Sequence, residues 1–96
     1  MMRPLLVRQC LEAIHVKSGL PVSVKCRIGV DSDDYNFLHN FVGEVSEGGK
    51  GVVQHFIVHA RQAILKGLSP GKNRKIPPLQ YDRVYQLSKD FPNLKI

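Results

Sequence analysis

Lys25 is the residue whose surroundings in the sequence most clearly call for chemistry. It lies in Val22–Ile28, where apolar residues alternate with Ser23, Lys25 and Arg27, the period of two that is typical of a strand. If the apolar face packs against helices, Lys25 points into the protein on the other face, where its charge requires an anion. The alternative is a shifted register or an edge strand, in which Lys25 only meets water.

His55 and His59 are four residues apart, which on a helix would place two zinc ligands on one face. They lie in Val52–His59, which is rich in β-branched residues and therefore predicts a strand. Residues four apart on a strand are separated by roughly 13 Å, too far to share a metal ion. We expect no metal site. His59, at the carboxyl end of the strand and just before Arg61, is the better site candidate, and His55 is expected to be structural or exposed.

The net charge of +6 is concentrated in the segment 58–80, which contains no acidic residue. Such a segment attracts polyanions, and a nucleic-acid phosphate backbone is the commonest of these. The alternative is a solvated loop in a basic protein. Ser69–Lys75 is rich in turn residues but lacks the glycine spacing of a phosphate-binding loop, so it would hold phosphates through side-chain charge. The basic residues are Arg61, Lys66, Lys72, Arg74 and Lys75.

The other reactive side chains favour structural explanations. Asp31, Asp33 and Asp34 lack the following glycine and glutamate of a calcium loop, and we expect them to cap the next helix. Cys10 and Cys26 form no Cys-x-x-Cys pair, so we expect free thiols rather than a disulfide or a zinc site. No serine or cysteine nucleophile motif is present.

The elements that must position these residues alternate between helix and strand, with strand starts about 30 and 40 residues apart. This is the rhythm of a parallel sheet in an α/β protein. Because the chain starts on a helix and stops early in a strand, we expect an excerpt of a larger domain. The expected elements are a helix from Pro4 to Gly19, a strand over Val22–Ile28, a helix through Phe37–Val45, a strand over Val52–His59, a short helix within Gln62–Leu68, a helix through Tyr81–Leu87 and the start of a strand at Leu94–Ile96.

The composition, 43% hydrophobic and 23% charged residues among 96, is that of a globular protein. No run approaches the ~18 apolar residues that a membrane span needs, and the start of the chain lacks the regions of a secretory signal. We expect a cytoplasmic or organellar protein with no membrane partner.

Four motifs together closely resemble the tRNA-dihydrouridine synthases, and most of all the A-type branch of that family. The resemblance runs over almost the whole chain, in the right order and spacing. The motifs are Lys-x-Arg-Ile-Gly within Pro21–Asp31, His-Ala-Arg within Phe56–Arg61, Ser-Pro-x-x-Asn-Arg-x-Ile-Pro-Pro-Leu within Gly67–Leu79, and Tyr81–Tyr85.

The resemblance implies a partial (β/α)8 TIM barrel, in which residues 1–96 supply two to three βα units and no second domain. It also implies an FMN-dependent enzyme that reduces a uridine of tRNA to 5,6-dihydrouridine with NADPH. Lys25 and His59 are then expected to contact FMN, where a cation would stabilise the negative charge of the reduced flavin. Lys25 would lie toward the carboxyl end of its strand, where barrel enzymes gather their active sites.

Other parts of the family's machinery have no counterpart in this chain. The proton-donating cysteine of the family lies in a Gly-Cys-Pro segment, and its FMN phosphate is held by Asn-Gly-Gly and Gly-Arg segments, none of which occurs here. We therefore expect no catalytic residue within the chain and no activity from it alone, and neither cysteine takes the acid's role. Arg61, Lys72 and Arg74 are the predicted tRNA contacts. Gly71 stands where A-type members often carry a lysine, which leaves the modified uridine open.

Two other interpretations remain at this point. The chain could act as it stands, as a small basic RNA-binding protein or an inert truncated gene product without catalysis. Another flavin barrel, such as a dihydroorotate-type oxidoreductase, would explain Lys25 but not the basic loop. Loss of Lys25 would weaken flavin retention in a synthase, whereas a pure RNA-binding protein would respond to loss of Arg61, Lys72 and Arg74.

Overall fold

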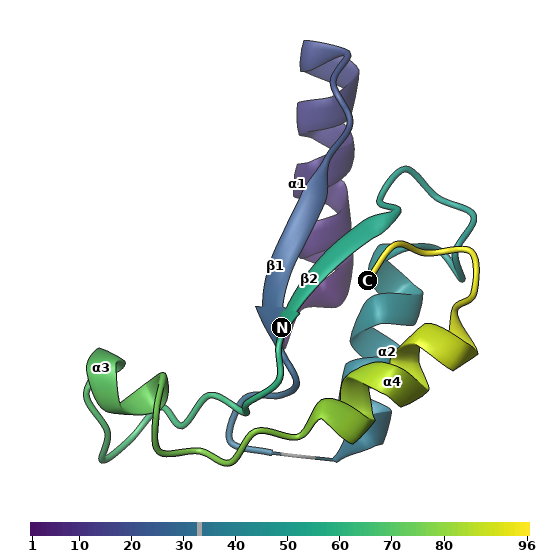
Figure 1. The fold of residues 1–96 in the computed structure, drawn as a ribbon. Helices are drawn as coiled ribbons and strands as arrows, with labels where there is room; N and C mark the ends of the chain where they lie inside the picture. Colours follow the sequence, from purple (N-terminus) through teal and green to yellow (C-terminus); the bar gives the residue numbers. More distant parts are fainter. Residues whose placement is uncertain (33) are drawn as a thin grey trace.

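Helices alternate with two parallel strands in the computed structural model, which describes residues 1–32 and 34–96 (Figure 1). The strands pair in register, with Ser23 beside His55 and Arg27 beside His59. The elements are α1 (Pro4–Ser18), β1 (Ser23–Arg27), α2 (Tyr35–Val45), β2 (His55–His59), α3 (Pro70–Asn73) and α4 (Tyr81–Asp90).

The C-terminal residues extend this sheet on the far side of β2. Lys95 forms an isolated parallel bridge with His55. The Phe56 amide donates to the Lys95 carbonyl at 2.9 Å, and the Lys95 amide donates to the Gln54 carbonyl at 2.9 Å. The strand expected at 94–96 therefore begins as a bridge, and β2 lies between β1 and this bridge.

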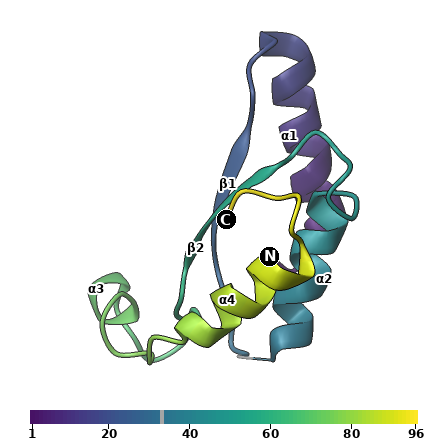
Figure 2. The same ribbon diagram turned by 45° about the vertical axis from the view of Figure 1, so that its right-hand side comes forward.

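One face of the β1–β2 pair is covered by α1, α2 and α4, as Figure 2 shows. Phe56 on β2 is fully buried and belongs to one apolar cluster with Leu38 and Val42 of α2 and Leu87 of α4. Burial of a side chain of this size contributes about 1.5–3 kcal/mol. α1 contributes partly buried residues to the same cluster, and Arg8 ties it to α2 by donating to the Glu44 carbonyl at 3.2 Å.

Two sequence predictions in the connections are wrong. Residues 52–54 do not extend β2, which begins at His55. The side chain of Gln54 is bound to the preceding turn, where its Nε2 donates to the carbonyls of Gly49 and Gly51 at 3.0 and 2.7 Å. The segment 62–68 forms no helix. Ala63 instead pairs with Val30 in an isolated parallel bridge, and the one helix of this connection, α3, begins later.

The acidic residues before α2 bind different parts of the chain. Asp34 is the N-cap of α2, and its carboxylate accepts from the Asn36 amide at 3.0 Å, as predicted. Asp31 does not cap this helix. Its carboxylate accepts from the Leu65 amide at 2.9 Å and so holds the connection after β2. Asp33 lies outside the described residues.

Candidate cofactor face and basic loop

The face of the β1–β2 pair opposite the helices is open and cationic. Lys25, Arg27 and His59 lie on it, and the parallel register places Arg27 directly beside His59 and Lys25 beside Ile57. Lys25 is exposed, and Ile57 is 46% exposed. The apolar residues of β1 face the helices, so the register is the one in which Lys25 points away from the core. This face ends where parallel strands usually present ligand sites, at their carboxyl ends.

His59 is half-buried and lies among three cations, and the pKa of its imidazole is lowered. Burial is the main cause that lowers the pKa of its imidazole below the usual 6.5, and the charges of Arg27, Arg61 and Lys25 lower it further. Arg61 also contacts the ring directly, with Nη1 at 3.0 Å from His59 Nε2. The side chain is half-buried. His59 therefore presents a neutral ring in a positively charged surrounding.

Arg27 links the open face to the connection that follows β2. Its Nη1 donates to the carbonyl of Gln62 at 3.3 Å and to the carbonyl of Asn73, in α3, at 2.9 Å. The sequence analysis placed Arg27 on the polar face of the strand but gave it no site role. The alternation of β1 showed which face it shares with Lys25, whereas no pattern in the sequence showed its partners.

Residues 62–80 form a loop whose two ends meet at one point. The Gln80 amide donates to the Ala60 carbonyl at 2.7 Å, and Arg61 Nε donates to the carbonyl of the buried Pro77 at 2.8 Å. We call these contacts the neck of the loop. Further out, the side chain of Asn73 accepts from the Ile64 amide and donates to the Ile64 carbonyl, both at 2.8 Å. Asn73 was not predicted as a functional residue.

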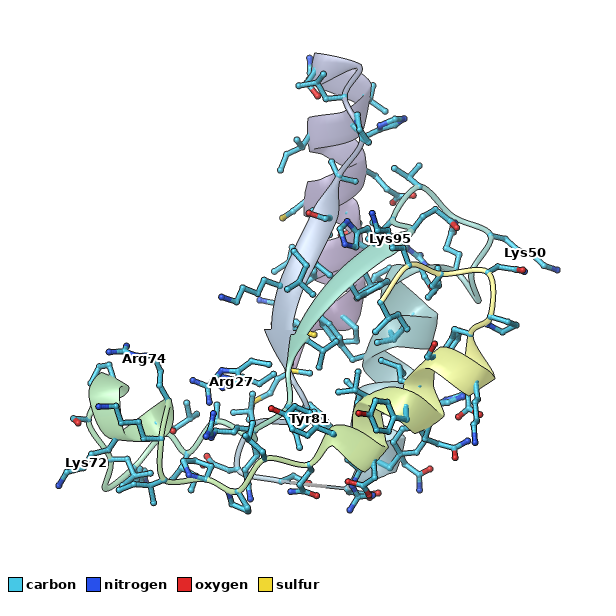
Figure 3. All side chains as sticks on the ribbon, in the orientation of Figure 1. Arg27, Lys50, Lys72, Arg74, Tyr81 and Lys95 are labelled. Atoms are coloured by element: carbon cyan, nitrogen blue, oxygen red, sulfur yellow. The ribbon has the colours of Figure 1, made fainter. Side chains whose placement is uncertain are left out.

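The outer part of this loop carries the other predicted basic residues. α3 is capped by Ser69, whose hydroxyl accepts from the Lys72 amide at 3.2 Å. Lys72, on α3, and Arg74, directly after it, are exposed. Figure 3 shows both away from the sheet, while Arg27 lies near the ends of the strands. The structure thus gathers Lys25, His59 and Arg61 at the sheet and places Lys72 and Arg74 on the projecting loop.

Within the part of the chain that the structure describes, the cations of the open face form no ion pair with a carboxylate. The ion pairs formed among residues 1–32 and 34–96 lie elsewhere, between Arg8 and three glutamates and between His39 and Asp90. A cluster of this composition suits an anionic ligand, because an external anion can supply the missing charge. Within the same described residues, no group of three histidine, cysteine or acidic side chains could hold a metal ion.

Two other features do not belong to this face. Cys26 packs against the helices, and burial raises the pKa of its thiol to about 11. The thiol is therefore protonated at neutral pH, and it lies on the opposite face of β1 from Lys25. A groove of about 730 Å³ lies between α1 and α2, lined by residues that include Leu5, Leu6 and Asn40. This groove lies on the helical side of the sheet, whereas Lys25, Arg27 and His59 are on the opposite face.

The parallel βα order defines an α/β protein with a cationic face near the carboxyl ends of its two strands, where proteins of this class usually bind their ligands. The family model described as dihydrouridine synthase matches residues 1–96. The chain belongs to the dihydrouridine synthase family, which confirms the resemblance seen in the sequence.

Similar curated proteins include the tRNA-dihydrouridine(20/20a) synthases of three bacteria. The protein of Pasteurella multocida is 54% identical over 90 residues, which cover 93% of this chain and 27% of that protein. The Escherichia coli K12 protein is also 54% identical over 90 residues, 93% of this chain and 26% of that protein. The Shewanella oneidensis protein is 52% identical over 97 residues, 100% of this chain and 28% of that protein. The chain therefore spans about a quarter of the length of these relatives.

Among the described residues, no helix is both long enough and apolar enough to cross a bilayer.

Proposed function

We propose that this chain is part of an FMN-dependent, NADPH-driven tRNA-dihydrouridine synthase, to which it contributes two to three βα units of a (β/α)8 barrel. The family membership and the names of the relatives support the reaction. The parallel pairing of β1 with β2, each followed by a helix, supports the barrel. The proposed target is a uridine at position 20 or 20a of tRNA, the positions in the names of the relatives.

The observation that carries this proposal is the cationic face of the β1–β2 pair. Lys25 is exposed on it, and the pKa of His59 on the same face is lowered by burial and by the nearby cations. The ion pairs among residues 1–32 and 34–96 all lie elsewhere. This donor set fits FMN, which is anionic and carries additional negative charge when reduced. When bound, FMN would supply the redox chemistry that reduces the 5,6 double bond of uracil.

The residues of this chain would bind FMN and tRNA and orient them for the reaction. Lys25 would hold a developing negative charge by direct electrostatic attraction, a contribution that is largest where water is excluded. Lys72 and Arg74, exposed on the loop, would bind tRNA phosphates. Arg61, the third predicted tRNA contact, has donors already directed to His59 and Pro77.

The test uses a complete synthase, made by replacing the matched 90-residue segment of the Escherichia coli K12 relative with this chain. Lys25→Ala should raise the FMN dissociation constant roughly 10- to 100-fold, the equivalent of one charge-assisted hydrogen bond. Flavin fluorescence on release measures this constant. Lys50→Ala is the matched control, because Lys50 is exposed at the far end of the fold (Figure 3) and should leave FMN binding unchanged.

Equal FMN retention in the two variants would contradict the proposed site. If RNA binding were then lost only on removal of Lys72 and Arg74, the chain would be an RNA-binding protein without a flavin.

A further inference from the structure

The side chain of Arg61 is committed to two contacts inside the protein. Nη1 lies 3.0 Å from His59 Nε2, and Nε donates to the Pro77 carbonyl at 2.8 Å. The guanidinium is half-buried at the neck of the loop, where the Gln80 amide also meets the Ala60 carbonyl. One side chain therefore joins the carboxyl end of β2 to the end of the loop that leads into α4.

The contact with the ring fixes the chemical form of His59. A guanidinium has only donors and stays protonated in proteins, so His59 Nε2 must accept. A ring that accepts at Nε2 is neutral and carries its one proton on Nδ1. The contact excludes the imidazolium, which has a proton on both nitrogens.

The charges around the ring favour the same form. Lys25 and Arg27 act on it from β1 and Arg61 from the segment after β2, and each disfavours a further positive charge. No carboxylate of the described chain is among the groups that shift its pKa. Burial and these charges lower the pKa of the imidazole below 6.5. Protonation of Nε2 would in addition break the contact with Arg61.

We propose that Arg61 is a positioning residue that holds His59 as the neutral, Nδ1-protonated form and ties it to the neck of the loop. His59 then offers one N–H donor and no charge to a ligand on the open face, while Lys25 offers the charge. This inference deepens the proposed function and rests on it only for the identity of that ligand. It gives Arg61 a different role from the tRNA contact predicted from its charge.

The first test is the form of the ring in the complete synthase, labelled with ¹⁵N-histidine and assigned by the signal that disappears in His59→Gln. We expect one tautomer, protonated at Nδ1, that stays neutral as the pH falls through 6.5. In Arg61→Met the titration midpoint should move up toward 6.5, and both tautomers should be populated. Arg61→Lys keeps the charge but not the planar fork, so the midpoint should stay low while the tautomers mix.

Arg83→Met is the matched control, because Arg83 lies near the same neck and its Nε contacts only Gln80, at 3.2 Å. It should leave the His59 signals unchanged. Signals of His59 that are identical in the parent protein, Arg61→Met and Arg61→Lys would overturn the proposal. Should Arg61→Met fail to fold, Arg61→Lys decides alone, because mixed tautomers support the proposal and a single tautomer refutes it.

The second test separates positioning from tRNA contact. The dependence of tRNA affinity on salt reports how many phosphates a protein contacts, with a slope change of about one for each contact. We expect Arg61→Met to leave this slope unchanged and to raise the FMN dissociation constant about tenfold. A slope lowered by about one with FMN affinity intact would make Arg61 a phosphate contact. If the synthase bound no FMN at all, the proposed function would fail, and the ring measurement would still decide the role of Arg61.

Discussion

The basic side chains at the strand ends and those on the projecting loop differ in their hydrogen-bond partners. Arg27 and Arg61, at the ends of the strands, direct their guanidinium groups to backbone carbonyls and to His59. Lys72 on α3 and Arg74 directly after it are exposed, and within the described residues their side chains make no hydrogen bond. Side chains of equal charge therefore have different roles. The inner pair, Arg27 and Arg61, holds the loop through its hydrogen bonds, and the outer pair, Lys72 and Arg74, is exposed to solvent. The flat, multi-donor guanidinium suits the inner role.

Among the variants that test this difference, Arg27→Met is expected to have the largest effect, which is on the stability of the loop. The loop would lose the two bonds to Gln62 and Asn73, and charged hydrogen bonds contribute about 1.5–3 kcal/mol. Trypsin cleavage after Lys66 in the complete synthase should become about 10- to 100-fold faster, because cleavage follows the population of the opened loop. Lys25→Met, two residues earlier on the same face, should cleave at the parental rate. Equal rates in both variants would show that Arg27 does not restrain the loop.

A smaller effect, of a different kind, is expected from Arg74→Met. This exposed side chain forms no hydrogen bond or ion pair with the described residues, so trypsin cleavage after Lys66 should not change. Its loss should reduce the salt slope of tRNA binding by about one and weaken binding several-fold at moderate salt. Filter binding at several salt concentrations measures both quantities. A faster-cleaved loop with an unchanged slope would move Arg74 into the inner group.

The smallest effect is expected from Gly71→Lys, which adds a cation to the outer group. A side chain fits there, because a Cβ on Gly71 would come no closer than 3.8 Å to another heavy atom, Arg74 Nη2. Binding of tRNA should tighten by a few-fold, with a salt slope raised by about one. Gly67→Lys adds the same charge at a strained position, since Gly67 has a positive φ of 87° that disfavours any other residue. It should therefore give less gain in binding than Gly71→Lys. No gain from Gly71→Lys would place this position outside the tRNA surface.

The features that could be predicted from the sequence are those set by neighbouring residues, namely the faces of the strands and the caps of the helices. The alternation in β1 placed Lys25 opposite the helices, and the β-branched residues before His59 predicted that it ends a strand. The caps at Gly19 and Asp34 also follow from local chemistry. These features depend on residues within a few positions of each other, which is the range over which sequence patterns carry information.

The features that were missed depend on partners far away in the chain. Arg27 and Asn73 are 46 residues apart, and Asp31 and Leu65 are 34 apart. Each contact joins a side chain to a backbone group, and every residue offers the same backbone groups, so no residue type marks the partner. The predicted helix over 62–68 was wrong for the same reason, because Ala63 pairs with Val30 instead.

The parallel pairing of β1 with β2 has a consequence during synthesis. Ser23 pairs with His55, so β1 is complete well before its partner emerges. At the usual rates of translation, the 32 residues between them take roughly 2–6 s. During this interval β1 is a nascent strand with an unpaired edge, which other chains could extend. Lys25 and Arg27 are charged side chains on that strand, and charge on an unpaired edge opposes association between strands. The two cations would therefore protect the new chain from aggregation before they serve the folded one.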